Sequence, residues 1–440
     1  IMREPFQLRF TYQGRPLLET SPGQPSTEAK PHFRFNLDPE EVLFGAGSRV
    51  LGHMNRRGER FDLYNSASYA YEDRAPLMYY SVPAVVSSRK YLLAFDNGAR
   101  GWLDLDSTGH GGLEFSAVGG RRAYLVVAGA DWRELASHLA DLTGHQPLLP
   151  RWALGHLSSR MGYHTQDEVE TVVRKLRDAG YPLDAMVLDL FWFGSSIFGN
   201  MGNLDWDATT FPEPVAMMDR LRDQGVQTIL VTEPLILRQS RNWSNAVAQR
   251  ALATDAAGQP YTFTSFFGEA ALVDVFKPEA REWFWSFYRH HTQSGVAGWW
   301  GDLGEPETHP DDLQHATGRG DEVHNLYGHT WARMVYEGFR RDFPHRRPFI
   351  LMRAGSLGTQ RFGILPWSGD VKRSWAGFKA QIELSLQMGL QGLAYMHSDL
   401  GGFAGELRDP ELYVRWLQYG VFQPLYRPHA HAFVPPEPIF

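Results

Sequence analysis

Residues 298–310, which read GWWGDLGEPETHP, combine acidic and aromatic side chains in an unusually dense way. Asp302, Glu305 and Glu307 place three carboxylates within six residues, and two tryptophans precede them. Carboxylates bind the hydroxyl groups of a sugar, while aromatic rings fit its apolar faces. A pair of carboxylates can also cleave a glycosidic bond when one is ionised and the other is protonated. The stretch therefore predicts a sugar-binding site with glycoside chemistry.

Further charged residues follow other apolar runs of the chain, each where a buried strand would end. If these runs are parallel strands of one barrel, their C-terminal ends meet at a single mouth. Four carboxylates, two guanidinium groups and one imidazole would converge there. They are Asp189 in VLDLFWFG, Asp302, Arg353 in ILMRAG, Asp370 in PWSGD, Asp399 in MHSDLGGF, and Arg427 and His429 in YRPHAH, with Phe191, Trp192, Trp299, Trp300, Trp367 and Phe403 beside them.

The three carboxylates of the first stretch are not equivalent. Asp302 ends a predicted strand and is held rigidly, as a nucleophile must be. Glu305 and Glu307 follow on the loop, so we interpret Glu305 as an orienting partner and Glu307 as solvated. Trp300 and Asp302 are two residues apart on the strand and share the pocket face, whereas Trp299 is expected to point toward the helices.

The segment ETHPDDLQH offers possible metal ligands, but their spacing matches no zinc or EF-hand pattern. We interpret it as an ordinary polar loop, and we expect no metal and no cofactor. The side chains concerned are Glu307, His309, Asp311, Asp312 and His315.

The bulk composition excludes several classes of protein. The chain has 440 residues, which suits a large barrel with one smaller domain, and a net charge of −7, which argues against a nucleic-acid surface. It contains no cysteine, so disulfides, thiolate metal sites and cysteine nucleophiles are excluded. The sequence contains no run of 18 apolar residues, so no membrane span is predicted. The start lacks the layout of a signal peptide, yet export stays open, with a periplasmic or secreted location slightly favoured over a cytoplasmic one. The oligomeric state is not indicated.

Two regions with different patterns divide the chain. Residues 1–145 hold short aromatic and β-branched runs punctuated by Gly, Asn, Asp and Ser, which predicts an antiparallel β-sandwich with a helix at 132–142. From 146 to 440, strands and helices alternate, which predicts a (β/α)8 TIM barrel of the α/β class. The eight expected strands are 152–157, 185–192, 227–233, 295–302, 348–354, 363–369, 392–399 and 421–427.

Individual helices of the barrel carry clear signals. Thr165 and Glu168 form a capping-box pattern. Val169, Val172, Val173 and Leu176 then repeat at helical spacing, and Gly180 ends the run. Helices are also predicted at 278–290 and 374–388. The segment 235–277 is too long for a simple loop between the third and fourth strands, so we expect it to be an insertion over the barrel mouth.

Taken in order, these motifs resemble glycoside hydrolase family 31, the retaining α-glucosidase family, over nearly the whole chain. GWWGDLGEPE resembles the nucleophile motif in the variant form of bacterial α-glucosidases and 4-α-glucosyltransferases, and WSGD resembles the acid/base motif. LTGHQPLLPRWALG resembles the family's entry into the barrel. FGAGSRVLGHMNRRGERFDLYN and YYSVPAVVS resemble its N-terminal β-sandwich.

The resemblance implies roles for individual residues. Asp302 would be the nucleophile and Asp370 the acid/base. Asp189, Arg353 and His429 would bind sugar hydroxyl groups in the −1 subsite. Other residues would line that subsite or its edge, namely Leu190, Trp300, Leu303, Trp367, Asp399 and Phe403.

The implied function is a retaining α-glycosidase that acts on α-glucosides or malto-oligosaccharides by double displacement, through hydrolysis or transfer to an acceptor sugar. An α-xylosidase or α-galactosidase of the same family is the nearer alternative, and a carbohydrate-binding protein without catalysis is the other. The sequence departs from the common family motif at Leu303 and Gly304, where methionine and asparagine are usual, and at Leu272, where a tryptophan is frequent. We expect the C-terminal β-domains of the family to lie outside these 440 residues.

Overall fold

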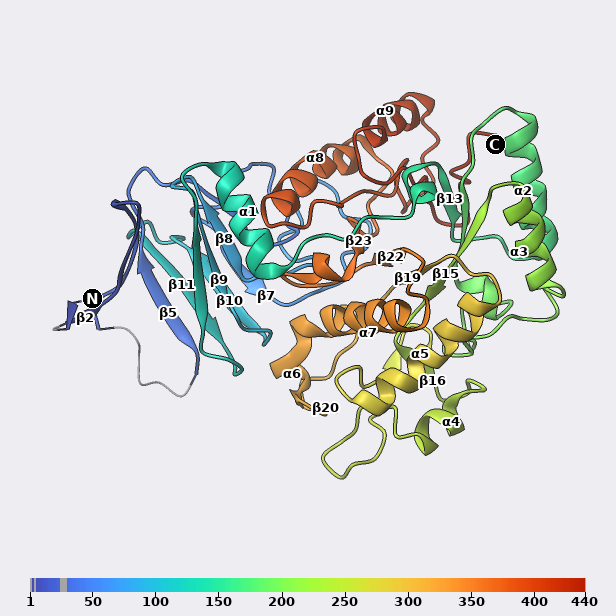
Figure 1. Cartoon of the computed structure of the whole chain (residues 1–440), viewed down its shortest axis with the longest axis horizontal. Coiled ribbons are helices and arrows are strands. Elements are labelled where there is room, and N and C mark those ends of the chain that lie inside the picture. Colours follow the sequence, from blue (N-terminus) through green and yellow to red (C-terminus); the bar gives the residue numbers. More distant parts are fainter. Residues whose placement is uncertain (1, 4, 24–29, 440) are drawn as a thin grey trace.

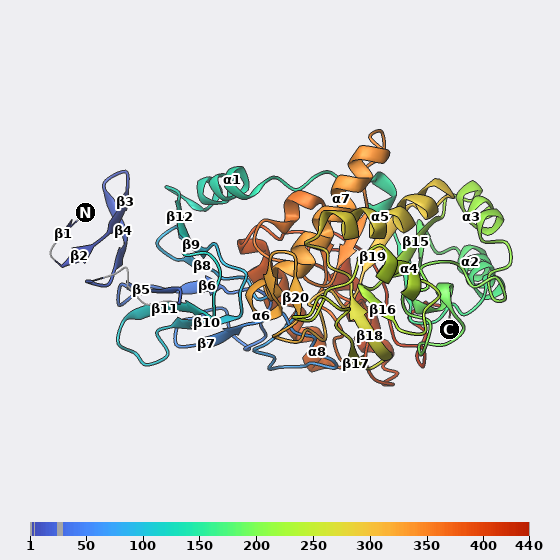
Figure 2. The same ribbon diagram turned by 90° about the horizontal axis from the view of Figure 1, so that it is seen from below.

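The structure, a computed structural model, describes residues 2–3, 5–23 and 30–439 (Figure 1). Antiparallel sheets form the N-terminal part, drawn in blue and cyan, and a parallel barrel with surrounding helices forms the rest. Seen from below, the β-sandwich lies next to the barrel (Figure 2). No helix in the described part of the chain is both long and apolar enough to cross a membrane.

The N-terminal part consists of two facing sheets and a short hairpin. Phe95 of one sheet stacks on Phe115 of the other with ring centroids 4.3 Å apart, and apolar side chains from both inner faces fill the space between them. The six-stranded sheet has the order β3 (Arg9–Tyr12), β4 (Arg15–Thr20), β5 (His32–Asn36), β11 (Gly112–Ala117), β10 (Gly101–Leu105) and β7 (Arg60–Leu63). The four-stranded sheet has the order β12 (Tyr124–Ala128), β9 (Tyr91–Phe95), β8 (Ala84–Ser87) and β6 (Leu43–Gly45), and β1 (Met2–Arg3) pairs with β2 (Phe6–Gln7).

Six parallel strands form most of the barrel wall. Every residue of β13, β14 and β19 is buried, as expected for strands covered on both faces. The order is β13 (Leu157–Arg160), β14 (Ala185–Leu188), β15 (Gln227–Thr232), β19 (Gly298–Gly301), β22 (Ile350–Met352) and β23 (Ile364–Pro366).

Two further chain segments close the barrel through isolated bridges. The amide of His397 donates to the carbonyl of Pro366 at 3.1 Å, and the amide of Leu400 donates to the carbonyl of Arg427 at 3.2 Å. On the other side, the amide of Leu157 donates to the carbonyl of Tyr426 at 3.0 Å. The eight-segment barrel expected from the sequence is therefore present, with isolated bridges in place of regular strands at its seventh and eighth positions.

The first expected strand was misplaced. Residues 151–154 form a 3-10 helix, η1 (Arg151–Leu154), and the strand begins at Leu157 rather than at residue 152. Pro150 lies at the N-terminal cap of η1, where its fixed backbone suits a helical turn. The strand has the sequence Leu-Ser-Ser-Arg. Because three of its four side chains are polar, it lacks the apolar run from which a buried strand is predicted. The expected strand 421–427 also began too early, because residues 421–424 form turns after the preceding helix and the bridge lies at Tyr426.

Helices surround the barrel, and those predicted after Thr165, at 278–290 and at 374–388 begin within one residue of the expected positions. Thr165 caps α2, because its hydroxyl accepts from the amide of Glu168 at 3.2 Å, and the predicted apolar face is buried. The helices are α1 (Trp132–Thr143), α2 (Gln166–Asp178), α3 (Pro214–Asp223), α5 (Pro278–Gln293), α7 (Tyr327–Asp342), α8 (Trp375–Leu390) and α9 (Pro410–Gly420), with the short turns η2 (Leu190–Phe193), α6 (Gly320–Val323), η3 (His324–Leu326) and η4 (Thr359–Phe362).

The segment 235–277 has its own secondary structure. Three antiparallel strands form a small sheet beside the barrel, and Leu272 lies buried in it. The elements are β16 (Leu235–Leu237), α4 (Trp243–Ala248), β17 (Phe263–Ser265) and β18 (Gly268–Leu272). A short hairpin of β20 (Gln314–His315) and β21 (Gly318–Arg319) lies farther along the chain.

Helix α8 joins the two parts of the molecule through buried polar contacts. The side chain of Gln387 accepts from the amide of Gly45 at 2.7 Å. Glu383 accepts from the amide of Leu51 at 2.9 Å and pairs with the buried guanidinium of Arg56 at 2.6 Å. The β-sandwich is thus held against one specific face of the barrel.

Candidate active site

The C-terminal ends of the barrel strands bring charged side chains to one mouth, as the barrel rule predicts. Each charge follows its strand or bridge directly or within a few residues. They are Asp189 after β14, Glu233 after β15, Asp302 after β19, Arg353 after β22, Asp370 after β23, Asp399 after the bridge at His397, and Arg427 and His429 after the bridge at Tyr426.

Arg353 lies at the centre of the carboxylates. Its guanidinium donates to both carboxylate oxygens of Glu305, at 2.7 and 3.0 Å. The same group contacts Asp302 at 3.2 Å and Asp370 at 3.4 Å. One planar cation therefore holds Glu305 with two hydrogen bonds and lies within ion-pair distance of both Asp302 and Asp370.

Solvent reaches only part of this cluster. The side chains of Glu305 and Arg353 are 0% and 3% exposed, whereas those of Asp302 and Asp370 are 19% and 18% exposed. One oxygen of Asp302, Oδ1, has no hydrogen-bond partner among the described residues. The two carboxylates that a ligand can reach are thus the two that the WWGD and WSGD motifs contribute.

A second guanidinium, that of Arg427, organises the neighbouring wall. It is fully buried and forms a short contact with the carboxylate of Asp399. Its charge lies 5.7 Å from the ring centres of both Trp300 and Trp367, and these two rings meet edge to face. Trp299 faces the opposite way, because its ring N–H donates to Thr292 of α5 at 3.0 Å. The alternation predicted for the two tryptophans is therefore present.

An aromatic and imidazole wall completes the mouth. His429 stacks on Phe403 with an interplanar angle of 5° and touches the ring of Trp300 edge-on. Its Nδ1 lies 2.7 Å from the hydroxyl of Ser159, and its Nε2 lies 3.9 Å from Asp189. Asp189 in turn accepts from the amide of Leu190 at 2.7 Å, so its carboxylate is fixed at the start of η2.

More carboxyl groups than cations are buried here, and this imbalance keeps protons on some of them. Burial raises the pKa of Asp189 and Asp370 to about 8 and that of Asp399 to about 7, against the opposing charges of the two arginines. Burial also raises the pKa of Asp302, while Arg353 opposes the shift. The pKa of His429 is lowered well below its usual range by burial, so the ring is neutral.

Glu233 is a member of the cluster that the sequence analysis missed. It follows β15 directly, it is 1% exposed, and neither of its carboxylate oxygens has a hydrogen-bond partner in the described structure. Burial, with Asp302 and Asp189 nearby, raises its pKa well above its usual range. The signal was present, because VTEP places an acid at the end of the third strand.

The β-sandwich also contributes to the mouth, which no barrel rule could predict. The hydroxyl of Tyr79 accepts from the amide of Asp370 at 3.0 Å, and the amide of Ala70 donates to the carbonyl of Asp370 at 2.8 Å. Tyr69 is 63% exposed and meets Phe403 edge-on. The N-terminal part therefore positions Asp370 and borders the opening.

The remaining predicted residues lie close by in the chain. Leu190 and Leu303 are buried next to Asp189 and Asp302, and Leu303 has a left-handed backbone with φ of 55°. This conformation is uncommon for a leucine and turns the chain directly after Asp302. Glu307 is exposed, in agreement with its interpretation as solvated. The described residues contain no group of three or more His, Asp or Glu side chains arranged to hold a metal ion.

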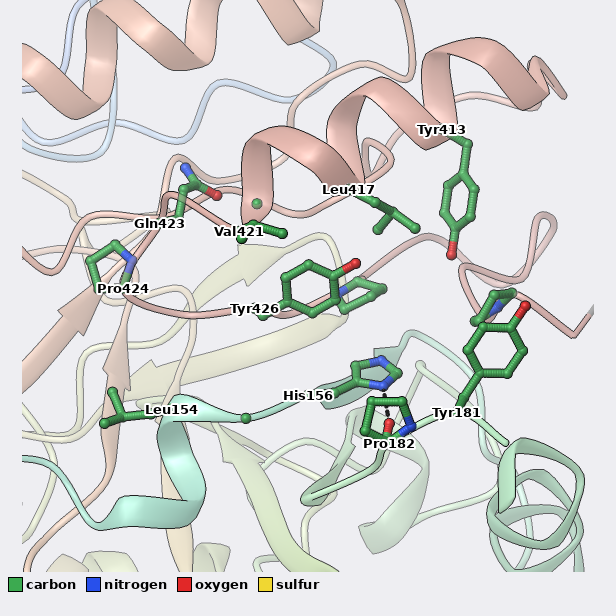
Figure 3. A pocket seen from close by; sticks show the side chains of 14 residues that line it. Leu154, His156, Tyr181, Pro182, Tyr413, Leu417, Val421, Gln423, Pro424 and Tyr426 are labelled. Atoms are coloured by element: carbon green, nitrogen blue, oxygen red, sulfur yellow. Dashed lines mark hydrogen bonds between the residues drawn. The ribbon is translucent and has the colours of Figure 1, made fainter. Parts of the chain in front are cut away.

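A surface pocket of about 370 Å³ lies elsewhere on the barrel (Figure 3). It is lined by residues that precede β13 and β14, such as His156 and Pro182, and by Tyr413, Val421 and Tyr426. These segments belong to the N-terminal ends of the strands and to α9. None of the clustered carboxylates lines this pocket, so we do not place the chemistry there.

Known families match both parts of the chain. Residues 146–439 match the glycosyl hydrolases family 31 TIM-barrel domain, and residues 1–104 match the glycosyl hydrolase 31 N-terminal galactose mutarotase-like domain. The chain belongs to glycoside hydrolase family 31. The resemblance seen in the sequence motifs and the fold class that it implied are thereby confirmed.

Individual family 31 proteins show how far the similarity extends. "Alpha-glucosidase 2" of Bacillus thermoamyloliquefaciens is 28% identical over 98% of this chain and 56% of its own length. An alpha-xylosidase of Saccharolobus solfataricus is 30% identical over 92% of this chain and 54% of its own. The solved structure of a family 31 dextranase of Flavobacterium johnsoniae complexed with glucose superposes with a TM-score of 0.91 at 30% identity, covering 98% of this chain and 55% of that one. The chain thus spans about half the length of these relatives.

Proposed function

We propose that this family 31 chain is the catalytic part of a retaining α-glycosidase, with Asp302 as the nucleophile and Asp370 as the acid/base. The observation that carries the proposal is the guanidinium of Arg353, which contacts both carboxylates, at 3.2 and 3.4 Å, beneath the open mouth of the barrel. A retaining mechanism needs two carboxylates on one sugar, roughly 5–5.5 Å apart. Two acids bound to the same planar cation suit that requirement.

The two carboxyl groups need opposite protonation states, and their surroundings favour this division. Burial raises the pKa of Asp302, but its contact with Arg353 opposes that shift and favours the ionised form that attacks the anomeric carbon. The pKa of Asp370 is raised to about 8 by burial, with Asp302 and Asp399 adding to the shift, so it holds a proton for the leaving oxygen. After the glycosyl–enzyme forms, Asp370 is the base that activates water or an acceptor sugar.

The substrate proposed is an α-glucoside at the end of an oligosaccharide. The buried acids Asp189 and Asp399, with His429, offer polar groups to sugar hydroxyls, and Trp300, Trp367 and Phe403 offer ring surfaces. A relative named alpha-glucosidase 2 and a dextranase solved with glucose support glucose as the sugar. Because an alpha-xylosidase is 30% identical, an α-xyloside is the second candidate.

Two variants and two kinds of leaving group test these roles. Asp302→Ala is expected to lower kcat by at least about 10³-fold on every substrate, because no covalent intermediate can form. Asp370→Ala is expected to lose about 10²–10⁴-fold on maltose or isomaltose, which need a general acid, but much less on a dinitrophenyl α-glucoside, which does not. Asp312→Ala, at an exposed residue outside the cluster, is the control. Equal losses of Asp370→Ala on both leaving groups would contradict the acid/base role.

The sugar preference needs a separate measurement. We expect kcat/KM for aryl α-glucosides to exceed that for aryl α-xylosides and α-galactosides, with the wild-type protein used throughout. Maltotriose and isomaltotriose, followed by chromatography of the products, would distinguish linkages, and longer products would indicate transfer. A higher kcat/KM for the xyloside would assign the second candidate.

A further inference from the structure

Three buried histidines form a chain of contacts behind the loop that follows Asp302. His309 belongs to that loop, while His315 and His324 come from the β20 and η3 segments. All three rings are buried, as are the acid and the backbone group at the two ends, Asp274 and Asn65. The β20 and α6 region lies on the side of the barrel that faces the β-sandwich (Figures 1 and 2).

Every nitrogen of the three rings has a partner at hydrogen-bond distance. Asp274 Oδ1 lies 3.0 Å from His315 Nδ1, and His315 Nε2 lies 2.8 Å from His309 Nε2. His309 Nδ1 lies 2.9 Å from His324 Nδ1, and His324 Nε2 lies 2.7 Å from the carbonyl oxygen of Asn65. The contacts run in a line rather than toward one point, so they do not form a metal cage.

The line has more hydrogen bonds than three neutral rings have protons. Four hydrogen bonds need four protons, one for each contact, and both ends of the line are acceptors, a carboxylate and a backbone carbonyl. Three neutral imidazoles supply only three protons. If the line held no more, one contact would bring two acceptors together at less than about 3 Å inside the protein, which buried polar groups avoid.

The fourth proton belongs on the rings rather than on Asp274. The other oxygen of Asp274, Oδ2, accepts from the amide of Ala316 at 2.9 Å, and a backbone donor favours the ionised carboxylate. The negative charge of Asp274 then balances one positive charge shared among the rings. No other acid has a hydrogen bond to these rings in the described structure.

The groups packed around the line are mostly aromatic and exclude water, and this desolvation opposes a charge on the rings. Tyr64 stacks on His324 at 3.6 Å, Phe276 meets His315 edge-on at 5.0 Å, and Tyr327 lies within about 6 Å of His309 and His315. Burial lowers the pKa of His324 to about 3, and Arg100 adds to this shift; that arginine pairs with Asp311 at the surface. Burial also lowers the pKa of His309 well below its usual range. Desolvation therefore favours three neutral rings, whereas the four hydrogen bonds require one additional proton on them.

We propose that His309, His315 and His324 hold one proton more than three neutral rings carry, balanced by Asp274, and that this proton ties the Asp302 loop to both flanking segments. Through His315 and Asp274 the line reaches the end of the 235–277 insertion, and through His324 and Asn65 it reaches the β-sandwich. His309 thus acts as a positioning residue for the loop that carries Asp302 and Glu305. That last consequence rests on the proposed function, whereas the proton count does not.

Asp274→Asn is the variant that isolates the proton. The asparagine oxygen can accept from the Ala316 amide, while its NH2 group donates to His315 Nδ1. The asparagine then supplies the proton of the first hydrogen bond, and three neutral rings supply the protons of the other three. The change removes one proton and keeps the four contacts of the line. It gives up one other hydrogen bond, which Asp274 Oδ1 accepts from the amide of Phe276 at 3.2 Å, so the variant is expected to fold with a modest loss of stability.

The measurement is a long-range proton–nitrogen NMR spectrum of the whole chain labelled with 15N-histidine, recorded at pH 8. At that pH an ordinary histidine is neutral, since its pKa is about 6.5. We expect Asp274→Asn to show one imidazolium fewer than the wild type among the 17 histidines. Asp312→Asn, a nearby exposed aspartate that accepts from Tyr261, is the matched control and should leave the count unchanged. Equal counts in wild type and Asp274→Asn would overturn the proposal.

A kinetic arm tests the positioning role independently. His309→Leu removes two contacts at the centre of the line, and kcat for an aryl α-glucoside is expected to fall about tenfold or more, with a smaller change in KM. Asp312→Asn should leave both constants unchanged. An unchanged kcat in folded His309→Leu would contradict the positioning role. If the wild type has no glycosidase activity, the proposed function fails, and the NMR count still decides the proton.

Discussion

At the scale of single residues, the site is dominated by two buried arginines and six carboxyl groups. Arg353 donates to Glu305 through Nε and Nη2. Its Nε also lies 3.2 Å from Asp302, and its Nη1 lies 3.4 Å from Asp370. Without Glu305, the buried guanidinium of Arg353 would be free to move toward Asp302 and Asp370. The least conspicuous acid of the GWWGDLGEPE stretch, Glu305, is therefore the one that sets the geometry.

The raised pKa of Asp370 makes a prediction about pH. As the proposed general acid it must be protonated, and its pKa is raised to about 8 by burial, so kcat/KM for an unactivated α-glucoside should decline as pH rises through about 8. The kcat/KM profile reports the free enzyme and is the right measurement. For a dinitrophenyl α-glucoside, which needs no acid in the first step, this alkaline decline should weaken or vanish. A decline already complete at pH 6 would contradict the assignment.

At the scale of elements, the helices were well predicted from sequence and the strands less so. Helices carry local signals: Thr165 and Ser374 cap α2 and α8 as their positions indicated. Strand β13 carries the sequence Leu-Ser-Ser-Arg, because Ser159 contacts His429 at the mouth and therefore cannot be apolar. When a strand contributes polar side chains to a site, it loses the apolar pattern from which the strand could be predicted.

Helix α8 provides the element-scale prediction. Glu383 pairs with Arg56, whose side chain is fully buried, and also accepts from two backbone amides. Glu383→Ala leaves that cation buried without its partner, so the free energy of unfolding should fall by about 3–5 kcal/mol. Lys379→Ala, at an exposed position one turn earlier on the same helix, should change it by less than about 0.5 kcal/mol. Urea unfolding of both variants measures the difference, and similar midpoints would show that the contact does not hold the two parts together.

At the scale of the whole molecule, the mouth is assembled from parts that are far apart in the sequence. The barrel strands supply the charges, and their order along the chain made most of them predictable. Tyr79 and Tyr69 come from the β-sandwich and meet Asp370 and Phe403 only because the two parts pack together. Contacts of that kind depend on tertiary packing, and no local pattern in residues 1–145 reports them. Glu233, in contrast, followed the same strand-end rule and was predictable.

The buried acids also make global stability depend on pH. The pKa of Glu233 is raised by burial in the folded protein, so its contribution to stability is fully present below its unfolded pKa and is lost as pH rises through the folded one. Glu233→Gln has no proton to lose at this position. Its free energy of unfolding should therefore exceed that of the wild type by a margin that grows from about pH 5 upward. Thermal or urea unfolding at several pH values tests this, and a margin independent of pH would contradict a buried proton on Glu233.

The central claim is that Asp302 and Asp370 act on opposite sides of one anomeric carbon in a retaining mechanism. The most direct test is the anomer of the glycosyl azide formed when azide rescues each alanine variant on a dinitrophenyl α-glucoside. In Asp302→Ala, azide would attack the substrate itself, and β-glucosyl azide is expected. In Asp370→Ala, azide would attack the glycosyl–enzyme, and α-glucosyl azide is expected. The same anomer from both variants, or the two anomers exchanged, would contradict it.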